Sequence, residues 1–254
     1  MNWVRRLSVA DYLTLGNAVL GFLAITYVID KRLTEASILI LVAILVDGLD
    51  GWAARRFGTT HHRGAILDSV ADAISFCLAP ALLLYTVFYD PARGPAWGDL
   101  PNALAVIAAT LVAIFGIARL ARFVTGDSQE RNFVGFPTPA NALLLVSLVQ
   151  LFGPDALLAR ADGLVLGVSL LASFLMVSEV PYPKVGDASR ILLIVAGGIV
   201  GVLFAATVAL GVREGLASLV LFILTLAIGV AYLAGGPFFA RVRPGEEVVP
   251  VHER

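Results

Sequence analysis

Long apolar runs recur along this 254-residue chain, and each is close to the roughly 20 residues that cross the hydrocarbon core of a bilayer. Hydrophobic residues make up 59% of the sequence and charged residues only 15%, against about 25% charged residues in ordinary soluble domains. The sequence therefore predicts an integral membrane protein. Its expected fold is all-α, a polytopic bundle of transmembrane helices in one compact domain.

The apolar runs divide into about eight predicted spans, separated by short loops that carry Gly, Pro and charge. The spans are Tyr12–Ile29, Ala36–Ala54, Ala65–Tyr89, Asn102–Phe123, Pro139–Phe152, Gly163–Val180, Ser189–Leu210 and Glu214–Ala234. The fifth is short for a full span. We assign residues 1–235 to the membrane-embedded domain and expect residues 236–254 to form a polar, disordered tail.

Basic residues predict the orientation of these spans. The 18 lysines and arginines fall mostly on the side that carries the N-terminus, and the other side keeps Lys31, Arg32, Arg93, Arg160 and Arg213. Because positive loops stay in the cytoplasm, we expect a multi-pass protein of the cell membrane with both termini cytoplasmic. A formal net charge of −1 gives no electrostatic reason to expect a nucleic-acid partner.

Four aspartates interrupt the apolar pattern between the second and third spans. Asp47 and Asp50 are three residues apart, and Asp68 and Asp72 are four apart, so each pair shares a helical face. Antiparallel neighbouring helices would bring all four together at the cytoplasmic surface. Gathered carboxylates repel one another, and their oxygens suit hard cations such as Mg²⁺, Mn²⁺ or Ca²⁺. Two such ions about 4 Å apart would clamp a phosphoryl group.

Small and basic residues accompany the acidic turn. Gly48 and Gly51 lie inside a predicted helix, where glycine costs roughly 1 kcal/mol relative to alanine, which suggests close approach by a ligand or another backbone. Arg55 follows one turn later and offers a bidentate clamp for a diphosphate.

Zinc is a poorer fit to this stretch. His61 and His62 are adjacent and would not share a helical face, so we interpret them as part of a solvated loop. The single cysteine, Cys77, lies in an apolar run and is interpreted as inert packing.

The stretch reads D-x-x-D-G-x-x-A-R-x8-G-x3-D-x3-D, which resembles the signature of the CDP-alcohol phosphatidyltransferase family. The matching residues are Asp47, Asp50, Gly51, Ala54, Arg55, Gly64, Asp68 and Asp72. The resemblance implies an enzyme that depends on Mg²⁺ or Mn²⁺. An alcohol hydroxyl attacks the lipid-side phosphate of a CDP-linked lipid, and CMP leaves.

The resemblance also implies a role for each motif residue. The four aspartates would be metal ligands, and Asp72 would in addition be the general base for the incoming hydroxyl. The CDP moiety would be held by Gly51, Ala54, Arg55 and Gly64. Proteins of this family often form homodimers, so a homodimer is expected.

Several further stretches resemble the phosphatidylserine synthase branch of the family. They are "DAISFCLAPALLLY", "GIARLARFVTG", "VGFPTPANA" and "FLMVSEVPYPKVG". The acceptor is then expected to be L-serine, whose carboxylate needs a cation. Arg119 or Arg122 would supply it, unless both are anchors for lipid phosphates. Lys184 has the same two interpretations.

Other readings stay open at this stage. Glycerol phosphate or inositol phosphate are alternative acceptors, and the lipid is either diacyl or an isoprenoid ether such as archaeol. A carboxylate-lined cation transporter is the non-enzyme alternative, although its acidic residues would be expected near the bilayer midplane. An intramembrane prenyltransferase would use different aspartate spacings. Asn17, a lone amide in the first span, either makes an interhelical hydrogen bond or lies near the nucleotide.

Overall fold

The computed structural model describes residues 8–57, 62–124, 133–154, 157, 160–182 and 216–242. Only the backbone is described at 52–57, 62–63, 133–134, 216–217 and 239–242. The predicted span Ser189–Leu210 lies outside the described residues, as do His61, Lys184 and residues 243–254.

The described chain is almost entirely helical. Its helices are α1 (Val9–Ile29), α2 (Leu33–Phe57), α3 (His62–Asp72), α4 (Ala79–Phe88), α5 (Leu100–Val124), α6 (Thr138–Phe152), α7 (Asp162–Val177) and α9 (Leu216–Val242). A π-helical segment, η2 (Ala73–Leu78), joins α3 to α4, and two 3₁₀ turns, Pro91–Arg93 and Ala96–Gly98, precede α5. Two short strands, β1 (Phe133–Val134) and β2 (Pro181–Tyr182), complete it.

Four helical stretches of the described residues are long and apolar enough to cross a membrane. They are Val9–Ile29, Gly64–Phe88, Leu100–Val124 and Ser218–Phe238. The helices α6 and α7 are apolar but shorter. These stretches support a membrane protein, while the predicted count of about eight spans is not confirmed. Helix α9 continues to Val242, so residues 236–242 are helical where the sequence predicted a polar tail.

Helices α1 and α2 form an antiparallel hairpin. A capping box begins α1: Ser8 Oγ accepts from the Asp11 N–H at 3.2 Å, and the Asp11 carboxylate accepts from the Ser8 N–H at 2.7 Å. A tight turn with Lys31 at φ +61° reverses the chain. Arg32 then pairs with Glu35 at 3.1 Å at the start of α2.

The third stretch runs without a break from α3 through η2 into α4. Within η2 the chain widens to i→i+5 hydrogen bonds, as in the bond from the Ala79 N–H to the Ile74 carbonyl. Pro80 follows directly and has no N–H to offer an α-helical partner. The wide turn brings Ser75 against α1, where its hydroxyl donates to the Asn17 carbonyl at 2.9 Å. Gly21 makes this approach possible, because a Cβ there would lie 2.7 Å from Ser75 Cα.

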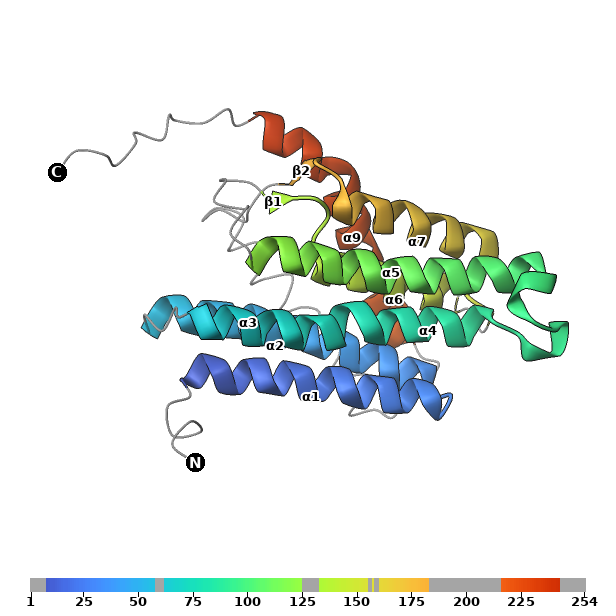
Figure 1. Cartoon of the computed structure of the whole chain (residues 1–254), viewed down its shortest axis with the longest axis horizontal. Coiled ribbons are helices and arrows are strands. Elements are labelled where there is room, and N and C mark those ends of the chain that lie inside the picture. Colours follow the sequence, from blue (N-terminus) through green and yellow to red (C-terminus); the bar gives the residue numbers. More distant parts are fainter. Residues whose placement is uncertain are drawn as a thin grey trace.

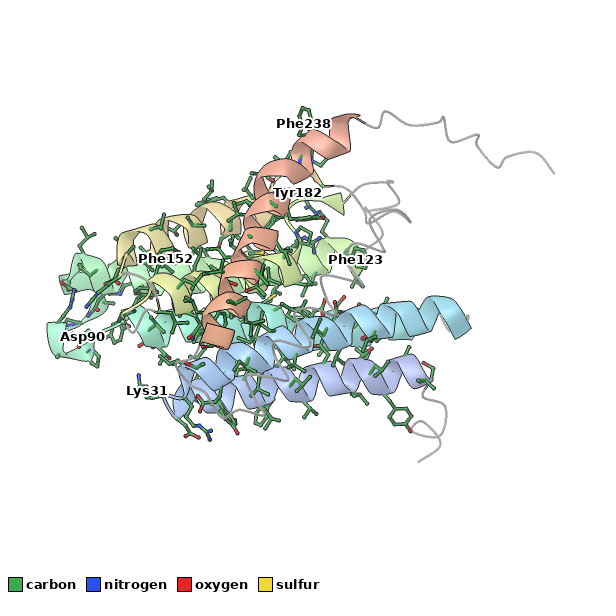
Figure 2. The ribbon with its side chains drawn as sticks, turned by 180° about the vertical axis from the view of Figure 1, so that it is seen from behind. Lys31, Asp90, Phe123, Phe152, Tyr182 and Phe238 are labelled. Atoms are coloured by element: carbon green, nitrogen blue, oxygen red, sulfur yellow. The ribbon has the colours of Figure 1, made fainter. Side chains whose placement is uncertain are left out.

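Helix α6 is central to the bundle and is buried along most of its length. Gln150 connects it to α2, since its amide donates to Ser37 Oγ at 2.9 Å. Ser147 connects it to α9 through a 2.7 Å hydrogen bond with Thr225. Helix α9 crosses the lengthwise helices steeply, as Figure 2 shows.

The bundle has two ends, which the labelled residues locate. Figure 2 places Lys31, Asp90 and Phe152 toward one end and Phe123 toward the other. In Figure 1, α3 and the strands β1 and β2 lie toward that second end. We call the end that carries the last turns of α2 and the first turns of α3 the site end, and the end that carries Lys31 and Asp90 the opposite end.

Strands β1 and β2 are a feature that the all-α prediction did not contain. They pair antiparallel, with Phe133 opposite Tyr182 and Val134 opposite Pro181. Two-residue strands carry too little periodicity to be predicted from sequence. They tie the start of α6 to the end of α7 at the site end of the bundle.

Candidate active site

The acidic motif converges as its spacing predicts. One carboxylate oxygen from each of Asp47, Asp50 and Asp68 lies within 4.8 Å of the other two. Asp50 is buried, and the other two are half-buried. Three carboxylates at this separation repel one another strongly, which makes the cluster suited to a divalent cation with oxygen ligands. The donor set therefore fits Mg²⁺ or Mn²⁺.

Asp72 lies one helical turn after Asp68 and outside this group of three. Its side chain is 8% exposed and interacts electrostatically with Asp47 and Asp68. The structure thus places the fourth aspartate beside the cluster, one turn further along α3. That position suits both roles expected of Asp72: it can bind the metal, and it can accept a proton next to the metal.

Helix α1 supplies neutral partners to the two most buried carboxylates. The Thr14 hydroxyl donates to Asp50 Oδ2 at 2.9 Å, and the Asn17 amide donates to Asp72 Oδ1 at 3.1 Å. Of the two readings of Asn17, the structure shows the interhelical hydrogen bond. Sequence reasoning missed Thr14. Its one signal was its position three residues before Asn17, on the same face of α1.

The two arginines at the end of α5 point to different surroundings. Arg119 is 8% exposed and interacts electrostatically with Asp72, Cys77 and Tyr232. Arg122 is half-buried, and one of its terminal nitrogens, Nη2, lies 3.0 Å from where a Cβ on Gly135 would be. Arg119 is therefore the buried cation near Asp72, whereas Arg122, which also interacts electrostatically with Arg119, packs against the chain between β1 and α6.

The small residues of the motif lie at the same end. A Cβ on Gly48 would meet nothing within 4 Å, so no other helix of the described chain approaches there and the space beside Gly48 is open. A Cβ on Gly64 would lie 3.6 Å from Asp11 Oδ1, an ordinary contact. Gly51 lies half-buried in α2, and the backbone at Ala54 and Arg55 is helical.

Cys77 is fully buried and packs on α5, as predicted for an inert thiol. Its sulfur would lie 2.5 Å from a Cβ on Gly116, so glycine is needed for the close contact between η2 and α5. His62 lies in the first turn of α3 by its backbone.

Three aromatic rings pack together near Arg119 at the site end. Phe136, Tyr182 and Tyr232 pack together, with Tyr182 stacked on Tyr232 at 5.6 Å between ring centroids. Burial raises the pKa of Tyr182, whose hydroxyl donates to the Leu233 carbonyl at 3.4 Å. The rings join β2 to α9 and form an apolar wall next to the buried guanidinium.

An apolar helical bundle with a carboxylate cluster at one end fits a membrane enzyme that acts on a lipid-linked phosphate. Comparison with known families is consistent with that class, because residues 7–238 match the family described as CDP-alcohol phosphatidyltransferase. The chain belongs to this family.

Curated relatives cover most of the chain. It is 37% identical over 178 residues to a CDP-diacylglycerol--serine O-phosphatidyltransferase of Methanocaldococcus jannaschii, covering 70% of this chain and 75% of the relative. It is 35% identical over 181 residues to an archaetidylserine synthase of Methanothermobacter thermautotrophicus, covering 70% and 71%. A CDP-diacylglycerol--serine O-phosphatidyltransferase of Bacillus subtilis is 32% identical over 171 residues, covering 67% and 87%.

Proposed function

We propose that this protein transfers a phosphatidyl-type group from a CDP-linked lipid to the hydroxyl of L-serine and releases CMP. The observation that carries the proposal is the convergence of Asp47, Asp50 and Asp68 within 4.8 Å, with Asp72 beside them, in a chain of this family. Relatives from archaea and bacteria that are named serine O-phosphatidyltransferases or archaetidylserine synthase support serine as the acceptor.

The reaction exchanges one phosphoester partner for another. The serine oxygen forms a bond to the lipid-side phosphorus, and the bond from that phosphorus to the oxygen bridging to CMP breaks. The hydroxyl proton passes to the Asp72 carboxylate, which the Asn17 amide orients through its 3.1 Å hydrogen bond. CMP leaves with the bridging oxygen.

Asp47, Asp50, Asp68 and Asp72 are the residues that would hold Mg²⁺ or Mn²⁺. The bound ion would supply charge stabilisation to the diphosphate as it breaks. The Thr14 hydroxyl keeps Asp50 aimed into the cluster. Partners of this kind typically change metal affinity or activity by about 10- to 100-fold when removed.

The CDP moiety is assigned to the open side of the cluster. Gly51, Ala54, Arg55 and Gly64 are the proposed contacts, and the unobstructed space beside Gly48 leaves room for a ligand to approach α2.

Arg119 and Arg122 are the acceptor-binding candidates. Arg119 is the stronger candidate, because it is buried and interacts electrostatically with Asp72, the proposed base.

The remaining parts of the proposal concern the setting. We assign the site and both termini to the cytoplasm, since the basic residues gather on that side. The domain is assigned to residues 1–235, and the enzyme to a homodimer. The lipid chains are left as diacyl or isoprenoid ether, because the reacting atoms are the same in both.

An acceptor screen tests the function. Purified protein in detergent is given Mn²⁺ and either CDP-diacylglycerol or CDP-archaeol, and CMP release is followed with L-serine, glycerol phosphate or inositol phosphate. We expect release with L-serine and not with the other two. Release with glycerol phosphate but not with L-serine would overturn the acceptor, and no release with any acceptor would overturn the transferase.

A further inference from the structure

The first turn of α6 carries buried polar groups that lack partners. Thr138 and Asn141 are both 0% exposed. Within the described part of the chain, Thr138 Oγ1 and both amide atoms of Asn141 have no hydrogen-bond partner. Folded proteins rarely leave such groups unsatisfied, so each one calls for a partner such as a ligand or an ordered water.

The rest of the same helix behaves differently. Ser147 bonds to Thr225 at 2.7 Å, and Gln150 donates to Ser37 at 2.9 Å. The polar side chains in the second half of α6 thus connect it to α9 and α2. Packing between helices therefore accounts for the distal polar residues of α6 but does not account for Thr138 and Asn141.

Thr138 lies where helix α5 contacts η2. Thr138 Cγ2 lies 3.7 Å from the position of a Cβ on Gly116, and the Cys77 sulfur lies 2.5 Å from the same point. Asn141 follows one helical turn after Thr138 and so shares its side of α6. Arg119 likewise follows one turn after Gly116 on α5. Because α5 runs toward the site end and α6 runs away from it, Arg119 and Asn141 lie one turn to either side of this contact. Side chains on a helix lean toward its N-terminus, so both lean back toward the contact.

The charged and polar groups around Arg119 and Asn141 match a zwitterionic amino acid. Arg119 is a buried cation that interacts with Asp72, the proposed base. An asparagine amide offers two N–H donors and one acceptor oxygen in a fixed geometry. A zwitterionic amino acid needs donors and a cation for its carboxylate and an acceptor for its ammonium. Arg122 lies against Gly135 and also interacts electrostatically with Arg119, so positive charge alone does not separate serine from a phosphate acceptor. The acceptor oxygen of Asn141 does separate them, because glycerol phosphate and inositol phosphate carry no ammonium.

We propose that Asn141 binds the amino-acid group of the acceptor serine, with Thr138 beside it. The Asn141 amide N–H groups donate to the serine carboxylate next to Arg119, and Asn141 Oδ1 accepts from the ammonium. The serine hydroxyl is then held on the side of Asp72. This inference rests on the proposed function and assigns its acceptor specificity to the first turn of α6.

The decisive variant is Asn141→Leu, which removes the amide at nearly constant size. We expect the KM for L-serine to rise about 10- to 100-fold, as for the loss of a hydrogen bond to a charged group, with the KM for CDP-lipid unchanged. The thermal midpoint without serine should stay the same or rise, because an unsatisfied buried amide is replaced by an apolar side chain. The upward shift of that midpoint on adding L-serine, in the presence of Mn²⁺ and CDP-lipid, should be lost.

Asn102→Leu is the matched control. Asn102 is equally buried, but its amide donates to the Asp90 carbonyl at 2.8 Å, and its oxygen accepts from the Asp90 N–H at 2.9 Å. Its replacement should lower the thermal midpoint and leave the KM for L-serine unchanged. The opposite responses of two buried asparagines separate a ligand-binding amide from a structural one.

An acceptor analogue adds a second readout. Ethanolamine lacks the carboxylate, so the ratio of kcat/KM for L-serine over ethanolamine should fall in Asn141→Leu. Thr138→Val should raise the KM for L-serine a few-fold. If Asn141→Leu does not fold, Asn141→Asp serves instead. Its carboxylate repels that of serine and should also raise the KM.

A lowered midpoint with an unchanged KM for L-serine in the Asn141 variant that folds would overturn the inference and make Asn141 a packing residue. The proposed function would then still stand, because the wild-type protein would release CMP with L-serine. Wild-type protein that uses another acceptor and not L-serine would overturn the proposed function itself.

Discussion

The two ends of the bundle both carry carboxylates, but they arrange them differently. At the opposite end two carboxylates form ion pairs with arginines nearby in sequence: Asp90 lies 3.5 Å from Arg93, and Asp162 lies 2.7 Å from Arg160. At the site end the aspartates gather against one another; helix α1 gives two of them neutral hydrogen-bond donors, Thr14 and Asn17, and the cation Arg119 interacts electrostatically with Asp72.

The difference shows what each arrangement is for. Exposed ion pairs between neighbours in sequence contribute roughly 0–1 kcal/mol and need nothing else to be satisfied. A cluster of like charges destabilises the folded protein until a cation binds. Such clusters are typical of functional sites, where a bound ligand offsets the repulsion. The opposite end is thus a solvated surface, whereas the site end is built around a cation and a phosphate.

The largest effect is expected from Asp72→Asn, because the variant removes the proposed base while keeping the shape of the side chain. CMP release should fall about 10²- to 10⁴-fold, the usual contribution of a general base, while CDP-lipid still binds. Asp90→Asn, at the opposite end, is the matched control and should leave CMP release near the wild-type level. Wild-type turnover in Asp72→Asn would refute the base role.

Removal of the neutral partners should have an intermediate effect. Asn17→Leu and Thr14→Val each leave a buried aspartate without its described hydrogen bond from α1. We expect a loss of about 10- to 100-fold in activity or in Mn²⁺ affinity. The Mn²⁺ dependence of CMP release checks this. An unchanged Mn²⁺ dependence and rate in both variants would mean that α1 only packs against the site.

A smaller effect, on stability alone, is expected from Gln150→Leu. Its amide connects α6 to α2 through Ser37 Oγ and the Leu33 carbonyl. Its loss should lower the free energy of unfolding by about 1–3 kcal/mol, because Ser37 and the helix end lose a partner. Thermal unfolding in detergent measures this, and the KM values for both substrates should not change. A changed KM would show that the α2–α6 contact positions the site.

The smallest effect is expected at the surface of the opposite end. Arg160→Ala breaks a pair whose arginine side chain is 58% exposed. The free energy of unfolding should change by less than about 1 kcal/mol and CMP release should not change. A large loss in either quantity would contradict the description of this end as a solvated surface.

Local spacing explains how much of the site was predictable. Asp47 and Asp50, and Asp68 and Asp72, each occupy one helical face, so a short connection between two helices was enough to predict that they meet. The partners from α1 depend on which helix lies next to that pair, and a single Thr or Asn in an apolar helix does not reveal this. The same holds for Asn141, whose lack of a described partner is visible only in three dimensions.

The helices of the fold were predicted from the sequence, whereas the details that depend on tertiary contacts were not. The helical character of each span followed from its apolar length, and the described helices begin and end near the predicted positions. The π-helical turn at η2 and the β1–β2 pair were not predicted, since both arise from tertiary contacts: Ser75 against Gly21, and Phe133 opposite Tyr182.

The most direct test of the account is Mn²⁺ binding followed by electron paramagnetic resonance on the purified protein. We predict that Mn²⁺ binds the wild-type chain, that CDP-lipid tightens this binding, and that Asp68→Asn weakens it strongly while Asp90→Asn does not. Mn²⁺ binding that persists unchanged in Asp68→Asn would contradict the assignment of the metal site to the gathered aspartates.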